Sequence, residues 1–143
     1  MALDTETLLR FFEKDQFAKH CNIELVAVSP GYARAKMPLH PYHWNGIGTV
    51  QGGAIFTLAD YTFAAASNAY GNVAVAINVN ISFMKAAVTG TLWAEAKENS
   101  KNHKLGNYTV EVKDDQGNLV ALFQGMVYRK QDSLPLASDS AAQ

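Results

Sequence analysis

Apolar and polar residues alternate along six segments of the chain, and a period of two positions predicts β-strands. Residues that favour turns separate the first two segments, and they also separate the last three. The pattern therefore predicts a hairpin in the first part of the chain and an antiparallel meander in the last part. The six predicted strands cover residues 23–28, 32–37, 73–84, 91–97, 105–113 and 119–129.

Two further segments have the spacing of helices. Leucines and phenylalanines stand among charged residues near the N-terminus, which predicts a short amphipathic helix over about residues 5–14. Residues 54–70 are small or apolar on nearly every face, and Gly71 and Asn72 follow them as a helix-ending signal. This segment predicts one long helix. Residues 38–53 have no clean period, and we expect an ordered loop there.

A helix that is apolar on all sides must be enclosed by other structure. We therefore expect an α+β fold in which one curved antiparallel sheet wraps around the helix. The length of 143 residues is that of one domain, which we place at residues 1–130. We expect residues 131–143 to form a flexible tail.

Composition and charge exclude several functions. The 12 Lys and Arg residues are balanced by 13 Asp and Glu residues without a basic run, which argues against nucleic-acid binding. The single cysteine allows neither an internal disulfide nor a cysteine-based zinc site, which favours a reducing compartment. Residues 1–10 lack the apolar core of a signal peptide, so we expect a cytoplasmic protein. The polar residues within 54–70 argue against a membrane span.

Asp60 is the only formally charged side chain between Lys36 and Lys85, and it lies within the most apolar predicted helix. A buried carboxylate without a partner costs several kcal/mol. It therefore needs hydrogen bonds, a raised pKa or a function. One interpretation is a structural carboxylate that accepts backbone or hydroxyl hydrogen bonds. We favour the other interpretation, a catalytic or binding group.

Gln51, Gly52 and Gly53 stand directly before the central helix. Two glycines allow a ligand to approach the backbone, and the free N–H groups of a first helical turn suit an anion or a developing oxyanion. The alternative is a tight turn without a function. The glycines at 46, 48 and 52 do not have the spacing of a dinucleotide-binding motif.

The two candidate groups are far apart on one helix. Asp60 follows Gly52 by eight residues, which corresponds to about 12 Å along a helix axis. One small reacting group could not easily contact both. If both serve the same carbonyl group, the helix start of one protomer has to face Asp60 of a neighbour, which predicts a site in a homodimer.

Other chemistry has less support. His40 and His43 are three residues apart without a nearby cysteine or carboxylate, so we expect no metal site. Ser67 and Ser82 lack the histidine and acidic partners of a serine-hydrolase triad at recognisable spacing.

Three short segments resemble the signature of a known family. Asn45, the triplet 51–53 and the triplet Leu58-Ala59-Asp60 resemble the Asn, His-Gly-Gly and Leu-Ala-Asp motifs of hotdog-fold acyl-CoA thioesterases of the phenylacetate-degradation (PaaI-like) branch. The strand over residues 78–84 and the segment 90–94 are also similar. The resemblance covers about residues 17–129 and is most specific over residues 45–60.

The resemblance implies a hotdog fold, assembly into homodimers and often dimers of dimers (homotetramers), and hydrolysis of the thioester of a small-to-medium acyl or aryl-acyl coenzyme A without a metal or cofactor. Asp60 would activate water or attack the thioester itself. Gly52 and Gly53 would donate N–H groups to the carbonyl oxygen, and Asn45 would orient water or the carboxylate. Gln51 departs from the usual histidine, and its amide cannot exchange protons near neutral pH.

The phosphates of coenzyme A need cationic or donor groups, and Lys85, Lys101 and Lys104 are candidates. Two other functions stay open. A dehydratase or hydratase on the same fold would normally need a histidine, and residues 51–60 contain none. A non-catalytic acyl-CoA-binding module would keep the fold without turnover.

Overall fold

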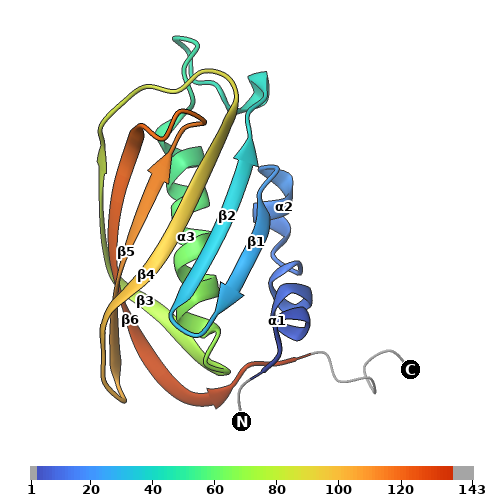
Figure 1. The fold of residues 1–143 in the computed structure, drawn as a ribbon, viewed down its shortest axis with the longest axis vertical. Coiled ribbons are helices and arrows are strands. Elements are labelled where there is room, and N and C mark those ends of the chain that lie inside the picture. The colour runs from blue at the N-terminus through green and yellow to red at the C-terminus, as the bar shows by residue number, and fades with distance from the viewer. Residues whose placement is uncertain (1–2, 137–143) are drawn as a thin grey trace.

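A long helix, α3, lies against the inner face of a six-stranded antiparallel sheet in a computed structural model that describes residues 3–136 (Figure 1). The order of the strands is β1-β2-β4-β5-β6-β3. Within the described residues, no helix combines the length and the apolar character that crossing a membrane requires. The elements are α1 (Thr5–Phe12), α2 (Gln16–His20), β1 (Glu24–Ser29), β2 (Tyr32–Pro38), the 3-10 turn η1 (Pro41–His43), α3 (Gly52–Asn68), β3 (Asn72–Phe83), β4 (Thr91–Lys101), β5 (Leu105–Lys113) and β6 (Leu119–Ser133).

The period-two pattern explains how the sheet encloses the helix. Alanines at the inward positions of β2 and β4 are fully buried, and their small size lets α3 pack close to these strands. Larger rings fill the space on the other side, where Phe63 of α3 packs against Tyr108 and Phe123. The predicted α+β fold with a curved antiparallel sheet around one helix is confirmed.

The helix predicted over about residues 5–14 is α1, which ends at Phe12, and a second helix, α2, follows it. Each helix has its own aspartate cap. The Asp4 carboxylate accepts the Thr7 N–H at 2.7 Å, and the Asp15 carboxylate accepts the Ala18 N–H at 3.0 Å. The second cap starts α2, which the apolar spacing alone did not indicate.

The C-terminal segment is ordered further than expected. The tail was expected to begin at residue 131, but β6 continues to Ser133, which pairs with Asn72 of β3. Leu134 is buried, and its N–H donates to the Gly71 carbonyl at 2.9 Å. The backbone pairing with β3 therefore corrects the expected boundary, and residues 137–143 of the expected tail lie outside the described residues.

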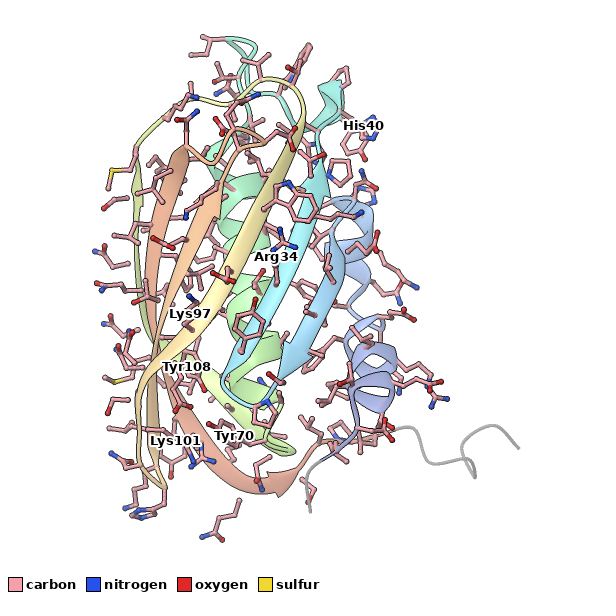
Figure 2. All side chains as sticks on the ribbon, in the orientation of Figure 1. Arg34, His40, Tyr70, Lys97, Lys101 and Tyr108 are labelled. Carbon is pink, nitrogen blue, oxygen red and sulfur yellow. The ribbon has the colours of Figure 1, made fainter. Side chains whose placement is uncertain are left out.

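A cluster of polar groups closes the end of the sheet where α3 ends. One oxygen of the Glu98 carboxylate accepts the hydroxyl of Tyr70 at 2.8 Å and that of Tyr108 at 3.1 Å. The Lys101 ammonium lies 4.3 Å from the centre of the Tyr70 ring. Both residues are labelled in Figure 2. Burial, together with the hydrogen bond to Glu98, raises the pKa of Tyr70 to about 12, so the hydroxyl keeps its proton at neutral pH.

Strand β3 forms one edge of the sheet. It pairs with β6 on one side, and the described residues provide no partner for its other side. Apolar side chains on and just after this strand are exposed, among them Val75, Ile77, Phe83 and Met84. Exposed edges with apolar residues favour pairing with another strand.

Gly125 of β6 provides a test of the packing between helix and sheet. A Cβ atom at this position would lie 2.6 Å from Cζ of Phe63. We expect Gly125→Ala to lower the free energy of unfolding by about 1–3 kcal/mol, because the Phe63 ring has to move within a packed core. Urea unfolding measures the change. Gly46→Ala is the control, since no atom lies within 4 Å of its added Cβ. Equal stability of the two variants would contradict the packing described here.

Candidate active site

The N-terminus of α3 presents free backbone donors. Gln51 is the N-cap residue, and its N–H donates to the His43 carbonyl at 2.8 Å. Its own carbonyl accepts the N–H of Ala54 at 3.0 Å. Within residues 3–136, the N–H groups of Gly52 and Gly53 donate to no other group. They are therefore available to a bound anion or oxyanion.

A side chain at Gly52 or Gly53 would press against a neighbouring group. A Cβ atom on Gly53 would lie 2.9 Å from the side-chain oxygen of Gln51, which folds back over this residue. A Cβ atom on Gly52 would lie 3.1 Å from the ring of Phe83. Side chains at these positions would displace the groups that flank the free amides. The alternative of a tight turn without a function stays open.

Two cavities flank the helix start. The larger, of about 820 Å³, lies between α2, the η1 turn and α3. The smaller, of about 350 Å³, lies between α3 and the end of β3. The larger is lined by Phe17, His20, Cys21, Tyr42, His43, Trp44, Gln51, Gly53, Ala54 and Thr57, and the smaller by Val50, Gly52, Ile55, Phe83, Met84, Lys85 and Ala86.

Asp60 lies two turns further along α3 and is half-buried. Within the described residues, its carboxylate accepts no hydrogen bond, because the neighbouring hydroxyls of Thr57 and Thr62 donate to carbonyls of their own helix. Burial raises the pKa of the Asp60 carboxyl above its ordinary value of 3.8, and the negative charge of Asp15 raises it further. These contacts do not support a structural carboxylate held by backbone or hydroxyl hydrogen bonds.

A single chain does not bring Asp60 to the helix start. Asp60 does not line either cavity beside the two glycines. Residues 53, 57, 60 and 64 lie on one face of α3 by their spacing, and this face is only partly covered. Gly52 and Asp60 both lie in the continuous helix α3, in which eight residues span about 12 Å along the axis. The pairing of these groups across a dimer stays a prediction.

Asn45 organises the loop that precedes α3. Its side-chain oxygen accepts the N–H of Ile47 at 3.0 Å and that of Thr49 at 3.2 Å, and its amide donates to the Thr49 hydroxyl at 3.0 Å. The side chain therefore closes the turn over residues 45–49. A direct contact of Asn45 with water or with a carboxylate stays a prediction.

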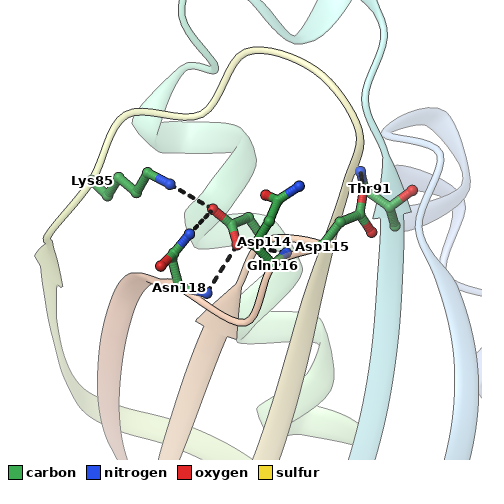
Figure 3. A network of polar contacts seen from close by, with 6 residues as sticks. All are labelled: Lys85, Thr91, Asp114, Asp115, Gln116 and Asn118. Carbon is green, nitrogen blue, oxygen red and sulfur yellow. Dashed lines mark hydrogen bonds and ion pairs between the residues drawn. The ribbon is translucent and has the colours of Figure 1, made fainter.

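The three candidate lysines lie in two places. Lys85 lines the smaller cavity beside Gly52, and its ammonium pairs with the Asp114 carboxylate at 2.7 Å (Figure 3). This hydrogen bond holds the pKa of Asp114 well below its usual range, so the charge of Lys85 is offset by a stable anion. Lys101 and Lys104 lie at the opposite end of the sheet, where Lys101 ends β4 and Lys104 precedes β5. Lys101 lies beside Tyr70 (Figure 2).

The sequence interpretation missed the rings around the larger cavity. Phe17, Tyr42 and Trp44 are exposed, although they are large and apolar. Trp44 is held in place by a hydrogen bond from its indole N–H to the Val88 carbonyl at 2.9 Å. For Tyr42 and Trp44, the available signal was their place as large apolar residues within a loop that has no period. His43 was interpreted as an ordinary loop residue, but its ring is buried and both nitrogens are engaged.

Comparisons with known proteins agree with this architecture. Residues 47–121 match the sequence profile of the Thioesterase superfamily. A relative from Archaeoglobus fulgidus is 39% identical over 128 residues, which cover 89% of this chain and 83% of the relative.

The acyl-coenzyme A thioesterase PaaI of Escherichia coli is 34% identical over 119 residues, which cover 82% of this chain and 85% of that protein. The solved structure of E. coli PaaI, from the phenylacetic acid degradation operon, superimposes with a TM-score of 0.85 and 30% identity, covering 90% of this chain and 97% of PaaI. The sequence match and the shared hotdog architecture lead to one conclusion: the chain belongs to the thioesterase superfamily, in its PaaI-like branch.

Proposed function

We propose that this thioester hydrolase acts on the thioester of a small-to-medium acyl or aryl-acyl coenzyme A. The observation that carries the proposal is the combination of two free amides at the start of α3 with an unpaired, half-buried carboxylate on the same helix. The similarity to the E. coli acyl-coenzyme A thioesterase supports the substrate class. The enzyme would act in the cytoplasm and would need no metal or cofactor.

The free amides suit the transition state of thioester cleavage. Attack on the carbonyl carbon places a negative charge on its oxygen. The N–H groups of Gly52 and Gly53 donate to that oxygen, and the positive end of the α3 dipole adds to the stabilisation. Because these donors are fixed by the helix, they need little reorganisation during the reaction.

Asp60 supplies the attacking group. As a general base, its carboxylate takes a proton from water while the water oxygen bonds to the carbonyl carbon. The carbon–sulfur bond then breaks, and the thiolate of coenzyme A leaves and takes up a proton. As a nucleophile, Asp60 would first form an anhydride, which water then hydrolyses. Gln51 can hold water or substrate by hydrogen bonds, but proton transfer falls to Asp60.

A homodimer completes the site in this proposal. Antiparallel pairing of β3 with β3 of a second copy would cover the exposed apolar residues of this edge and continue the sheet. Under the twofold symmetry of such a dimer, the two α3 helices would also run antiparallel to each other. Asp60 of one protomer would then approach Gly52 and Gly53 of its partner. A dimer of dimers, a homotetramer, is the further assembly that we propose.

Lysines contact the phosphates of coenzyme A in this proposal. Lys85 is placed beside the smaller cavity next to Gly52, although it shares its charge with Asp114. Lys101 and Lys104 lie at the opposite end of the sheet, so in this proposal they would contribute from the partner protomer of the dimer. Such contacts position the substrate and do not take part in bond cleavage.

Replacement of Asp60 tests the assignment of the reacting group. We expect Asp60→Asn to lower kcat at least about 100-fold, because the amide can neither accept the proton of water nor attack the thioester. Free-thiol release from a panel of aliphatic and aromatic acyl-CoAs, with EDTA present, measures the loss and the acyl preference. Asp4→Asn, at the cap of α1, is the control and should keep wild-type turnover.

Three outcomes would contradict the proposal. Full activity of Asp60→Asn would assign the chemistry to another residue. Binding of the conjugates by wild type without hydrolysis would favour a non-catalytic acyl-CoA-binding module. Dehydration or hydration of the acyl chain, detected by mass spectrometry of the products, would favour a dehydratase or hydratase.

The pH dependence of kcat/KM tests the environment of Asp60. The carboxyl must be ionised to act, so activity rises with pH through its pKa. Because burial and Asp15 raise this pKa, we expect the midpoint of the acid limb above 3.8. Asp15→Asn keeps the α2 cap but removes the charge, so it should move the midpoint to lower pH. If the midpoint of Asp15→Asn equals that of wild type, the charge of Asp15 does not raise the pKa of Asp60.

A charge on the β3 edge tests the dimer. Ile77 is 54% exposed. We expect Ile77→Lys to convert the dimer to monomers, because like charges would meet across the twofold axis. Loss of the dimer should also lower kcat. Light scattering after gel filtration measures the mass. Val26→Lys, on the opposite edge strand β1, is the control. A monomeric wild type with full activity would refute a site shared between protomers.

A further inference from the structure

His43 is a buried histidine that the proposed reaction does not use. Its side chain is 4% exposed, and both ring nitrogens make hydrogen bonds. Nε2 lies 2.7 Å from the Cys21 carbonyl oxygen, and Nδ1 lies 3.0 Å from the backbone nitrogen of His40. The ring therefore connects the end of α2 to the start of the η1 turn.

These two partners determine the protonation of the ring. A backbone N–H can only donate, so Nδ1 accepts from His40 and carries no proton. A carbonyl can only accept, so Nε2 carries the proton and donates it to Cys21. The ring is thus neutral and in a single tautomer, with no nitrogen left for proton transfer to a substrate. An apolar residue would fill the same space but would leave both backbone groups without these partners.

The backbone of His43 extends this connection to the helix start. Its carbonyl accepts the N–H of Gln51, the residue directly before the two free amides. A second hydrogen bond links the end of α2 to the residues before the η1 turn, since the Asn22 side-chain amide donates to the Pro38 carbonyl at 3.0 Å. The chain of contacts runs from Cys21 through the ring and carbonyl of His43 to Gln51.

The opposite side of the helix start is held by a different segment. The Val50 N–H donates to the Ala87 carbonyl at 2.8 Å, and the Trp44 indole donates to Val88. The peptide that precedes Gly52 is therefore fixed from two directions. His43, Trp44 and Gln51 all line the larger cavity, so the contact from His43 to Gln51 lies in its wall.

We propose that His43 is a positioning residue that sets the orientation of the Gly52 and Gly53 amides through the carbonyl that accepts the Gln51 N–H. This inference rests on the proposed role of those amides in holding the thioester oxygen. Loss of the ring contacts lets the η1 turn shift and carries the Gln51 peptide with it. A displacement of about 1 Å in such a group can cost on the order of 100-fold in rate.

Three substitutions separate the two ring contacts. His43→Asn keeps an acceptor near the position of Nδ1, and His43→Gln keeps a donor near the position of Nε2. His43→Leu removes both. Val127→Ala is the control. Val127 is buried in β6 and lines neither cavity, so its truncation should lower stability through lost core contacts without touching the site.

We expect His43→Leu to lower kcat at least about tenfold while KM for an acyl-CoA changes less than about threefold. His43→Asn or His43→Gln should recover part of kcat. The backbone amide resonances of Gly52 and Gly53 should move in His43→Leu and stay unmoved in Val127→Ala. Nitrogen NMR of wild type should find His43 protonated at Nε2 alone.

Several results would overturn the inference. The first two are a kcat of His43→Leu equal to that of wild type, and amide resonances of Gly52 and Gly53 that do not move in this variant. The others are a loss of kcat in Val127→Ala as large as in His43→Leu, and a proton on Nδ1 of His43 in wild type. If His43→Leu does not fold, the Asn and Gln variants and the tautomer of wild type carry the test. If wild type itself lacks thioesterase activity, the proposed function fails, whereas the NMR measurements still decide whether His43 orients the amides.

Discussion

The enclosure of α3 is the constraint on which the rest of the structure depends. A helix with small or apolar residues on nearly every face is unstable in water, so the chain surrounds it. The sheet covers most of its surface, with alanines on β2 and β4 and aromatic rings on β5 and β6. One face, which includes Asp60, is left only partly covered. The same constraint therefore creates both the core and the place for a polar group within it.

Much of the fold could be predicted from local pattern. Period-two alternation located all six strands, and the absence of a polar face on the central helix indicated its enclosure. The second helix, α2, was missed because its signal is the single cap residue Asp15 rather than a repeat. The end of β6 was also missed, because Ser133 has no strand pattern of its own and is ordered by pairing with Asn72.

The candidate site was only partly predictable. Asp60 and the glycine pair stand out in the sequence by charge and by position, and the structure adds which groups lie beside each glycine. The role of His43 depends on contacts with residues 21 and 40, and the backbone groups that it meets leave no trace in side-chain pattern. Gln51 illustrates the same limit. Its side chain folds over Gly53, which the motif alone does not reveal.

The shared hydrogen bonds of Tyr70 and Tyr108 to Glu98 have a consequence for the motions of the molecule. They fasten the sheet to the segment that follows α3, whereas the start of α3 is held by the backbone hydrogen bonds of Val50 and Gln51. Both ends of the helix are therefore tied to their surroundings, which limits its motion as a unit. A substrate that arrives at the helix start meets donors that are already in place, so little conformational entropy would be lost on binding.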